Sequence, residues 1–189
     1  MKDIFKLNIF IWILMMMTIY VSGNAQQEFS LDKNPKMVVE GTSSLHDWEM
    51  VSNTANGSAL LTLSNGKITG MESAKISMDV NTLKSGRGGM DNNAYKALNA
   101  DKNPTIIFTL KKAVLQGNRW KVTGNLEMAG ATKEVQFEVQ TAMEGSKVKI
   151  TGQTAFKLTD FGVDPPTAVF GTIKTGDEVR LNVEMKLIP

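Results

Sequence analysis

Apolar and polar residues alternate one by one along much of this chain. Over 73–80, 134–140 and 179–187 every second residue is apolar, and the residues between are charged or polar. This period of two is typical of β-strands with one buried and one wet face. Weaker versions of the pattern run through 37–51, 57–64, 105–115, 119–128 and 147–158. The sequence therefore predicts eight strands, separated by short turns rich in Gly, Asn, Asp and Ser.

Eight strands that are each wet on one side need one shared dry interior. A two-sheet sandwich or a closed up-and-down barrel would supply it. Gly124 and Gly152 fall on the apolar faces of their strands, where a glycine lets a strand bend or leaves room beside it. Both effects favour a barrel over a flat sandwich. We therefore expect an all-β fold, an eight-stranded antiparallel up-and-down barrel whose interior is filled by side chains or holds one small ligand.

Two segments interrupt the alternation. Residues 84–103 are glycine-rich at first, then helical in character over 91–98, and they end at Asn103-Pro104. We expect a short helical excursion there, between the third and fourth strands, that covers one end of the barrel. Residues 159–176 form a second long connection, in which Pro165-Pro166 prevents regular strand pairing.

The N-terminal residues differ in composition from the rest of the chain. Lys2 and Lys6 precede an almost continuous apolar run over 7–21, and small residues follow at 23–25. This pattern predicts a secretory signal peptide over 1–25 and a domain over 26–189. An uncleaved anchor is the alternative, but the run is shorter than the ~20 residues of a spanning helix. We expect the mature protein to be periplasmic or secreted and not to span a membrane.

Charge and metal-ligating residues narrow the class of partner and site. The chain has a net charge of +2 with interspersed charges and no polybasic run, so a nucleic-acid partner is not expected. It contains one histidine and no cysteine, which cannot make a zinc or copper site of the usual type. We therefore expect no metal, no cofactor and no catalytic residues.

One cluster supports a competing, catalytic interpretation. Residues 41–50 read GTSSLHDWEM, which places His46 beside Asp47 and near Glu49. The alternative function is thus a hydrolase or other enzyme that acts on a lipid-like or glycan substrate. The chain has no G-x-S-x-G nucleophile elbow, however, and acids two residues apart on a strand usually form its solvated face. We interpret the stretch as the end of the first strand, at the barrel rim.

A glycine-rich stretch over 85–89 opens the helical segment. Such a loop could cradle a phosphate, but it lacks the lysine spacing of a nucleotide-binding loop. With Lys84 and Arg87 at the barrel mouth it could instead face an anionic head group. A plain mobile loop is the remaining interpretation.

Several stretches together resemble the YceI-like family. They occur in order over about 29–188: GTSSLHDWEM at 41–50, MDVNTL at 78–83, MD at 90–91, YKAL at 95–98, PTIIF at 104–108, VTGNL at 122–126, GATK at 130–133 and LTDFG at 158–162. The resemblance implies a lipocalin-like barrel, a periplasmic or secreted location, and an elongated apolar pocket for polyisoprenoids or other long-chain amphiphiles. It implies no established enzymatic activity. Many members open the helical segment with Arg-Asp, where this chain has Met90-Asp91.

We therefore expect an exported protein that holds a long-chain lipid or isoprenoid for transport, storage or stress protection, rather than an enzyme. The residues expected to contact this ligand are Met78, Phe108, Leu110, Trp120, Leu126, Met128, Phe137, Phe156 and Leu158, with Phe161 and Phe170 closing the mouth and His46 and Trp48 near a head group. A filled barrel that acts as a partner-binding module is a further alternative. The oligomeric state, a dimer included, stays open.

Overall fold

The computed structural model describes residues 25–189. The predicted signal peptide lies outside the described residues except for Ala25, where the first strand begins. Within this described part of the chain, no helix is long and apolar enough to cross a bilayer.

Strands dominate the described residues. They are β1 (Ala25–Leu31), β2 (Lys36–Ser43), β3 (Trp48–Ser52), β4 (Asn56–Ser64), β5 (Lys67–Asp79), β6 (Thr105–Gln116), β7 (Arg119–Met128), β8 (Ala131–Glu144), β9 (Lys147–Lys157), β10 (Thr167–Ala168) and β11 (Ile173–Ile188). The short helices are η1 (Val80–Thr82), α2 (Gly88–Ala97) and η2 (Leu158–Phe161). All strand pairs are antiparallel, which confirms the all-β antiparallel prediction. Helix α2 lies where it was expected, between the third and fourth predicted strands, which are β5 and β6.

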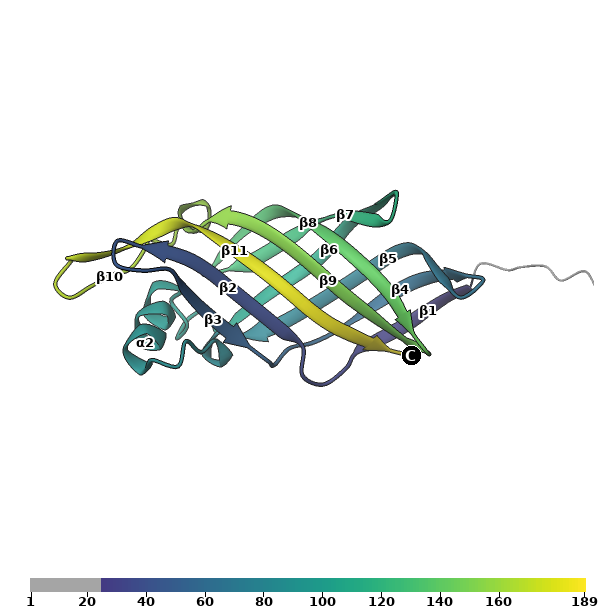
Figure 1. Ribbon diagram of the computed structural model, residues 1–189, viewed down its shortest axis with the longest axis horizontal. Helices are drawn as coiled ribbons and strands as arrows, with labels where there is room; N and C mark the ends of the chain where they lie inside the picture. Colours follow the sequence, from purple (N-terminus) through teal and green to yellow (C-terminus); the bar gives the residue numbers. More distant parts are fainter. Residues whose placement is uncertain (1–24) are drawn as a thin grey trace, which may run out of the picture.

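The strands pair into a closed circuit (Figure 1). Neighbours follow the order β1, β4, β5, β6, β7, β8, β9 and β11, and β11 pairs again with β1 at Ser30↔Ile188 and Leu31↔Leu187. The β2–β3 hairpin continues along the edge of β11 beyond β1. At the far edge of this hairpin, Val51 exchanges backbone hydrogen bonds with Lys84, which follows η1. The circuit thus gives the chain one shared interior.

The expected number of eight strands is wrong, because residues 25–189 form eleven. β1 and the two-residue β10 were not predicted, and the predicted first strand over 37–51 is a hairpin, β2 turning into β3. In the turn, the Ser43 hydroxyl accepts hydrogen bonds from the amides of Leu45 and His46 and donates one to the His46 carbonyl. These bonds offer the backbone an alternative to ladder pairing, so the chain reverses here.

The predicted alternation determines which side chains face inward. On β7, for example, every second residue from Trp120 to Met128 is buried, and the residues that alternate with them are more exposed. Gly124 lies in this inward row, and a Cβ at its position would collide with the ring of Phe108. The glycine therefore makes room for an aromatic side chain, and Phe108 meets Phe137 edge-to-face with 5.3 Å between ring centroids.

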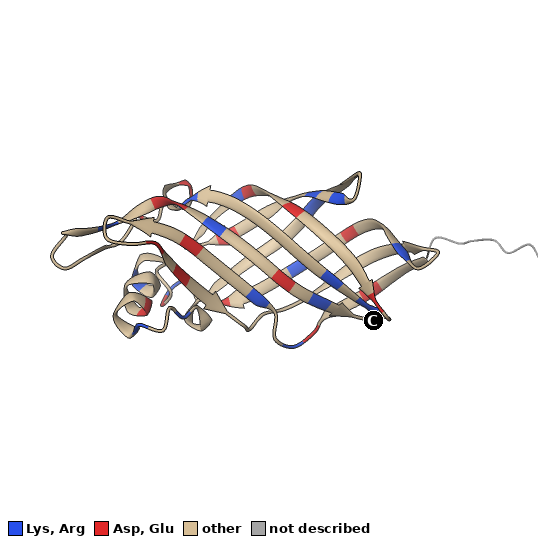
Figure 2. Cartoon of the chain, viewed as in Figure 1, with Lys and Arg blue, Asp and Glu red and all other residues tan. Residues whose placement is uncertain are grey.

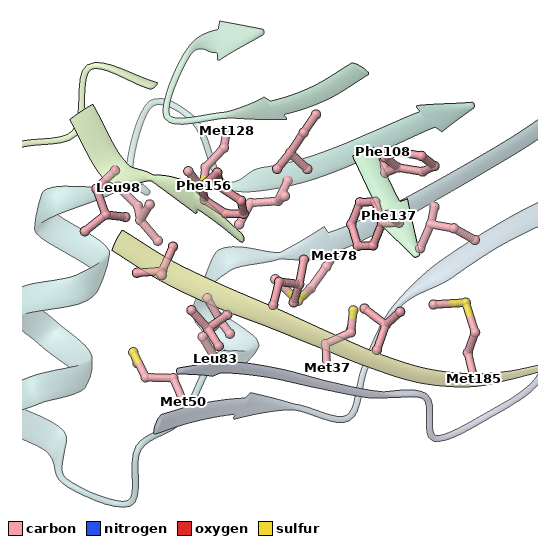
Figure 3. Close-up of a pocket in the computed structure, with 18 of the residues that line it drawn as sticks. Met37, Met50, Met78, Leu83, Leu98, Phe108, Met128, Phe137, Phe156 and Met185 are labelled. Atoms are coloured by element: carbon pink, nitrogen blue, oxygen red, sulfur yellow. The ribbon is translucent and has the colours of Figure 1, made fainter. Parts of the chain in front are cut away.

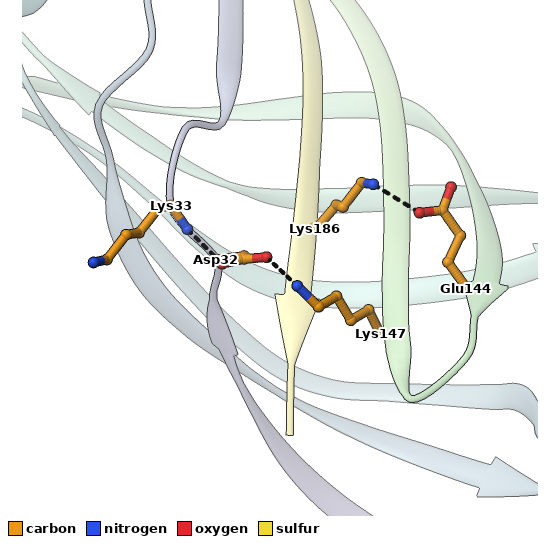
Figure 4. A network of polar contacts seen from close by, with 5 residues as sticks. All are labelled: Asp32, Lys33, Glu144, Lys147 and Lys186. Atoms are coloured by element: carbon orange, nitrogen blue, oxygen red, sulfur yellow. Dashed lines mark hydrogen bonds and ion pairs between the residues drawn. The ribbon is translucent and has the colours of Figure 1, made fainter.

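The outer face carries charges of both signs along neighbouring strands (Figure 2). The region beside the β1–β11 pairing is here named the seam. There Lys147 contacts the Asp32 carboxylate at 2.8 Å and Lys186 contacts Glu144 at 2.8 Å (Figure 4). Hydrogen bonds from these two lysines hold the pKa values of Asp32 and Glu144 below their ordinary values. Because the pairs are exposed, they contribute little to stability.

Helix α2 is fixed to one end of the sheet by polar contacts. The buried Asp91 accepts hydrogen bonds from the hydroxyl and amide of Ser85 at 2.6 and 2.8 Å, and these bonds lower the pKa of Asp91. The Tyr95 hydroxyl donates to the Leu83 carbonyl at 2.6 Å and accepts from Lys84, which raises the pKa of Lys84. The glycine-rich segment is therefore held in place against the sheet rather than left as a free loop.

Candidate functional site

The interior of the closed sheet contains a cavity of about 230 Å³ (Figure 3). Inward side chains of β2 to β9 and β11 form its wall, and α2 contributes Ala94 and Ala97. The wall residues spread along the strands from Leu98, beside α2, to Met185 near the C-terminal end of β11 (Figure 3). The cavity therefore follows the length of the strands, as an extended chain would require.

The wall of this cavity is almost wholly apolar. Among the described residues that line it none is charged, and polar side-chain atoms come from Thr175 and Trp48. The indole nitrogen of Trp48 already donates to the Thr42 carbonyl at 2.9 Å. A molecule in the cavity would thus be held by apolar contact, with little polar recognition.

Methionines are concentrated in the wall. The chain has twelve methionines, four of them in the first 24 residues, and six of the other eight line the cavity. They are Met37, Met50, Met71, Met78, Met128 and Met185. Thioether side chains are flexible and fill irregular spaces, so this wall can adapt to ligands of different shape.

One end of the cavity, here named the closed end, is filled by a second apolar cluster. Phe29, Leu61 and Val148 are almost completely buried there, and they pack with Ala59 and Leu187, which also line the cavity. Phe29 comes from β1, so the unpredicted strand supplies the largest side chain of this cluster. These side chains form the floor of the cavity.

The opposite end, here named the open end, is where the lining residues reach the surface. Half-buried Trp48, Pro166 and Thr175 line the cavity there, and the Thr175 amide donates to the Pro166 carbonyl at 3.2 Å. A Cβ on Gly41 would collide with the ring of Trp48, so this glycine lets the ring lie across β2. Helix α2 covers part of the same end (Figure 1). A chain that enters the cavity would pass these residues.

The structure brings together most of the residues predicted to contact a ligand. Those that line the cavity are Trp48, Met78, Phe108, Leu110, Leu126, Met128, Phe137, Phe156 and Leu158. Trp120 is buried but lies outside the lining, with its indole nitrogen donating to the Thr141 hydroxyl at 3.3 Å. Phe161 is buried behind Phe156, with 5.2 Å between ring centroids. Phe170 is fully exposed and does not cover the mouth as expected.

His46 does not point into the sheet. It lies exposed in the β2–β3 turn, where Nδ1 is 2.7 Å from the Asp47 carbonyl oxygen and Nε2 is 3.2 Å from Arg87. The contact with Asp47 is made by its backbone carbonyl. Among the described residues, no carboxylate is hydrogen-bonded to this imidazole. The expectation that GTSSLHDWEM ends a strand at the rim is therefore replaced by a turn whose Trp48 lines the cavity while His46 faces outward.

The ligand-contacting residues predicted from the sequence left out many wall residues, among them two groups that belong to single structural units. Met37, Val39 and Met50 belong to the β2–β3 hairpin, whose turn was not foreseen. Val179, Leu181, Val183, Met185 and Leu187 form the inward row of β11. The regular alternation of 179–187 already indicated that this second group shares one apolar face. It did not show which other strands this face contacts.

Other chemistry is not assembled in the described residues. Within 25–189, no group of three or more His, Asp or Glu side chains lies close enough to hold a metal ion. Near α2, Lys84 is engaged with Tyr95 and Arg87 with His46, so both cations proposed for a head group already have side-chain partners. The cavity is the feature of this region that can bind a molecule.

Comparison with known proteins agrees with this architecture. The sequence profile of the YceI-like domain matches residues 29–187. The chain belongs to the YceI-like family. The resemblance inferred from the sequence is thereby confirmed.

Relatives of this YceI-like chain are distant. A UPF0312 protein of Pseudomonas aeruginosa is 26% identical over 100 residues, which cover 49% of this chain and 52% of that protein. The chain thus matches about half the length of such curated relatives. Among solved structures, BcnA of Burkholderia cenocepacia aligns with a TM-score of 0.68 and 19% identity over 82% of this chain and 99% of that one.

A polyisoprenoid-binding domain from Saccharophagus degradans, implicated in plant cell wall breakdown, has a similar fold. It aligns with a TM-score of 0.64 and 11% identity, over 85% of this chain and 97% of that chain. At these identities the likeness establishes the fold that the YceI-like chain shares with both structures.

Proposed function

We propose that this chain is an exported binding protein that holds one long-chain apolar molecule, a polyisoprenoid or another lipid-like amphiphile, inside the closed sheet. The observation that carries the proposal is the apolar, methionine-rich cavity that follows the strands. The polyisoprenoid binding of the structurally similar Saccharophagus domain supports the same ligand class. Transport, storage or protection under stress are the roles that such binding would serve.

The ligand would be held mainly by burial of its chain. Removal of apolar surface from water contributes about 25 cal/mol per Å², so a long chain gains affinity with each added carbon that the cavity encloses. The cavity volume of about 230 Å³ is below the ~300–1,000 Å³ of typical ligand pockets. A long chain would therefore displace wall side chains, and the flexible methionines are suited to move. The polar end of the molecule would stay near Trp48 and Thr175, at the open end.

The alternative functions receive less support. An enzyme built on His46 with Asp47 or Glu49 would need these groups in a cleft, and all three are exposed. A partner-binding module with a filled interior would need no cavity, whereas the interior contains one. We therefore favour binding without catalysis.

Native mass spectrometry of the full chain, expressed with its own leader and isolated in mild buffer, tests the proposal. The expected result is a co-purifying lipid or, for delipidated protein, uptake of the fluorescent fatty acid cis-parinaric acid. Ala59→Leu and Ala74→Leu fill cavity space and should weaken uptake, while Ala155→Leu on the outer face of β9 should not. Absence of both lipid and uptake would overturn the proposal. Cell fractionation of the same culture tests the exported location.

A further inference from the structure

Two hairpin tips at the open end carry exposed apolar side chains. Leu45, in the β2–β3 turn, is 65% exposed, and Val169 and Phe170, between β10 and β11, are 61% and 107% exposed. Apolar side chains that are exposed together can mark a site of contact with a protein or a membrane. These three side chains therefore form a candidate contact surface.

The two tips form one unit. The Ser44 amide donates to the Lys174 carbonyl at 2.9 Å, and the Lys174 amide donates to the Ser44 hydroxyl at 3.1 Å. Lys174 in turn pairs with Thr167 of β10, so the β2–β3 turn is attached to the base of the β10–β11 hairpin. The β10–β11 tip projects beyond the rest of this end (Figure 1). Leu45, Val169 and Phe170, here named the apolar tips, therefore leave the molecule at the same end.

The apolar tips stand next to the cavity. Leu45 is three residues before Trp48, and Phe170 lies between Pro166 and Thr175 in sequence. All three flanking residues line the cavity at its open end. Whatever covers the tips thus also meets the mouth of the cavity.

The β10–β11 tip has a defined backbone. Val169 and Phe170 both have positive φ, 50° and 53°, a conformation that non-glycine residues seldom adopt. Hydrogen bonds from the Gly171 amide to the Ala168 carbonyl and from the Thr172 hydroxyl to the Val169 carbonyl hold this turn. The Gly171 amide and the carbonyls of Ala168 and Val169 are thus bonded internally, which lowers the cost of moving them into an apolar medium.

Turns at the closed end are different. The β4–β5, β6–β7 and β8–β9 turns consist of Asn65-Gly66, Gly117-Asn118 and Gly145-Ser146. Val114 and Leu115 are also exposed, at 38% and 48%, but they lie in strand β6 before the β6–β7 turn. Among these turns, apolar side chains at the turn itself thus occur at the end where the cavity opens. Within 165–175, Lys174 is the one charged residue, while Asp47 and Glu49 lie behind Leu45. This mixed charge gives no reason for strong attraction to anionic surfaces.

We infer that the apolar tips insert into the surface of a lipid bilayer and dock the open end of the cavity against it, so that a lipid can pass between bilayer and cavity with little exposure to water. A protein partner would need a broader contact than two narrow tips, since stable protein interfaces bury at least about 1,000 Å². A bilayer accepts separate apolar side chains. The inference deepens the proposed function and relies on it for the passage of the lipid, but not for the docking itself.

Vesicle flotation tests the docking. The full mature chain is expected to float with phosphatidylcholine vesicles, with little change on addition of phosphatidylglycerol. A triple variant with Leu45→Ser, Val169→Asn and Phe170→Asn should bind roughly tenfold or more weakly, because three apolar side chains no longer insert. Asn suits the positive φ at 169 and 170, so the turn is preserved. Leu115→Ser, at an exposed position in β6 near the β6–β7 turn, is the matched control and should bind as the wild type does.

A second variant reports on insertion directly. Phe170→Trp should be quenched by brominated phosphatidylcholine, whereas Leu115→Trp should not be. If the wild type does not float, or if both tryptophans respond alike, the docking inference is overturned. Capture of a protein in place of vesicles would also overturn it.

Measurements with cis-parinaric acid separate this inference from the proposed function. If the tips dock, the triple variant should take up the probe slowly from vesicles but reach normal occupancy from detergent. Uptake without any vesicle binding would refute docking and leave the proposed function intact. Vesicle binding with no uptake from either source would support docking and refute the proposed function.

Discussion

The two ends of the closed sheet use the same alternating strands for opposite purposes. At the closed end, Phe29, Leu61 and Val148 fill the interior and the turns are short and polar. At the open end, a cavity is left in the interior, α2 and the long connection between β9 and β11 accompany short turns such as β2–β3, and Leu45, Val169 and Phe170 are exposed. Alternation therefore determines which side chains face the interior, but not whether that interior is densely packed. Side-chain size and the connections at each end decide the latter.

The largest expected effect is at the closed end. Phe29→Ala should lower the free energy of unfolding by about 3–5 kcal/mol, because Phe29 is 1% exposed and its removal leaves a void in a packed cluster. Phe170→Asn, the control at the other end, should change it by less than about 0.5 kcal/mol. Denaturant unfolding of both variants measures the difference. Equal losses would mean that the two ends do not differ in packing.

The open end should instead be sensitive to the bonds that fix α2. Asp91→Ala leaves the Ser85 amide and hydroxyl without their acceptor and should cost about 1–3 kcal/mol. Hydrogen exchange should rise in α2 and leave β1 unchanged. Asp101→Ala, at an exposed acid just after the helix, is the control and should have no effect.

Asp91 should also contribute to the pH dependence of stability. Its pKa is lower in the folded chain than the ordinary value of 3.8, so the unfolded state binds its proton more readily. The stabilisation is therefore complete above about pH 4–5 and disappears as the pH falls through the folded pKa. Asp91→Asn should flatten the acid side of the stability profile. A profile that is unchanged from the wild type would show that the Ser85 bonds do not favour the carboxylate.

The chain length of the fatty acid that binds most tightly should depend on the floor of the cavity. Ala59→Phe adds a ring at the closed end, where Ala59 meets both the cavity and the packed cluster. Affinity for the longest fatty acids in a chain-length series should fall about tenfold, since fewer carbons are buried, while short ones bind as before. Ala155→Phe on the outer face is the control. A uniform loss at all lengths would contradict a floor at this end.

The smallest expected effect concerns the charges at the seam. Lys147→Gln removes the contact with Asp32, and because both groups are exposed the melting temperature should change little. What change there is should vanish at high salt, which screens such pairs. A large, salt-independent loss would show that the seam depends on this pair.

Much of the fold could be predicted from alternation alone. The segments 73–80, 134–140 and 179–187 became β5, β8 and β11, because each has one apolar face and this face must be buried. β1 was missed since AQQEFSL has few apolar residues, and Phe29 gains its burial from partners far away in sequence. The β2–β3 turn was missed because Ser43 makes it with side-chain hydrogen bonds, which the hydrophobic pattern does not reveal.

The site was predictable face by face but not residue by residue. Trp120 and Leu126 share the inward face of β7, yet only Leu126 lines the cavity, because Trp120 packs into the wall with its indole bonded to Thr141. Phe170 was expected to cover the mouth, although nothing in its loop fixes an inward direction. In the structure Phe170 has a positive φ and is fully exposed, and neither property is visible in the hydrophobic pattern.

The register that closes the sheet has a consequence for folding kinetics. Only two residue pairs join β1 to β11, and they connect Ser30 and Leu31 with Ile188 and Leu187. β11 also pairs with β2, β9 and β10, so this strand, which follows all the other described strands in sequence, supplies a hydrogen-bonding neighbour to four of them. Contacts of such high sequence separation form late and slow the search for the native state. The strands that precede β11 therefore cannot complete their pairing before β11 has been synthesised.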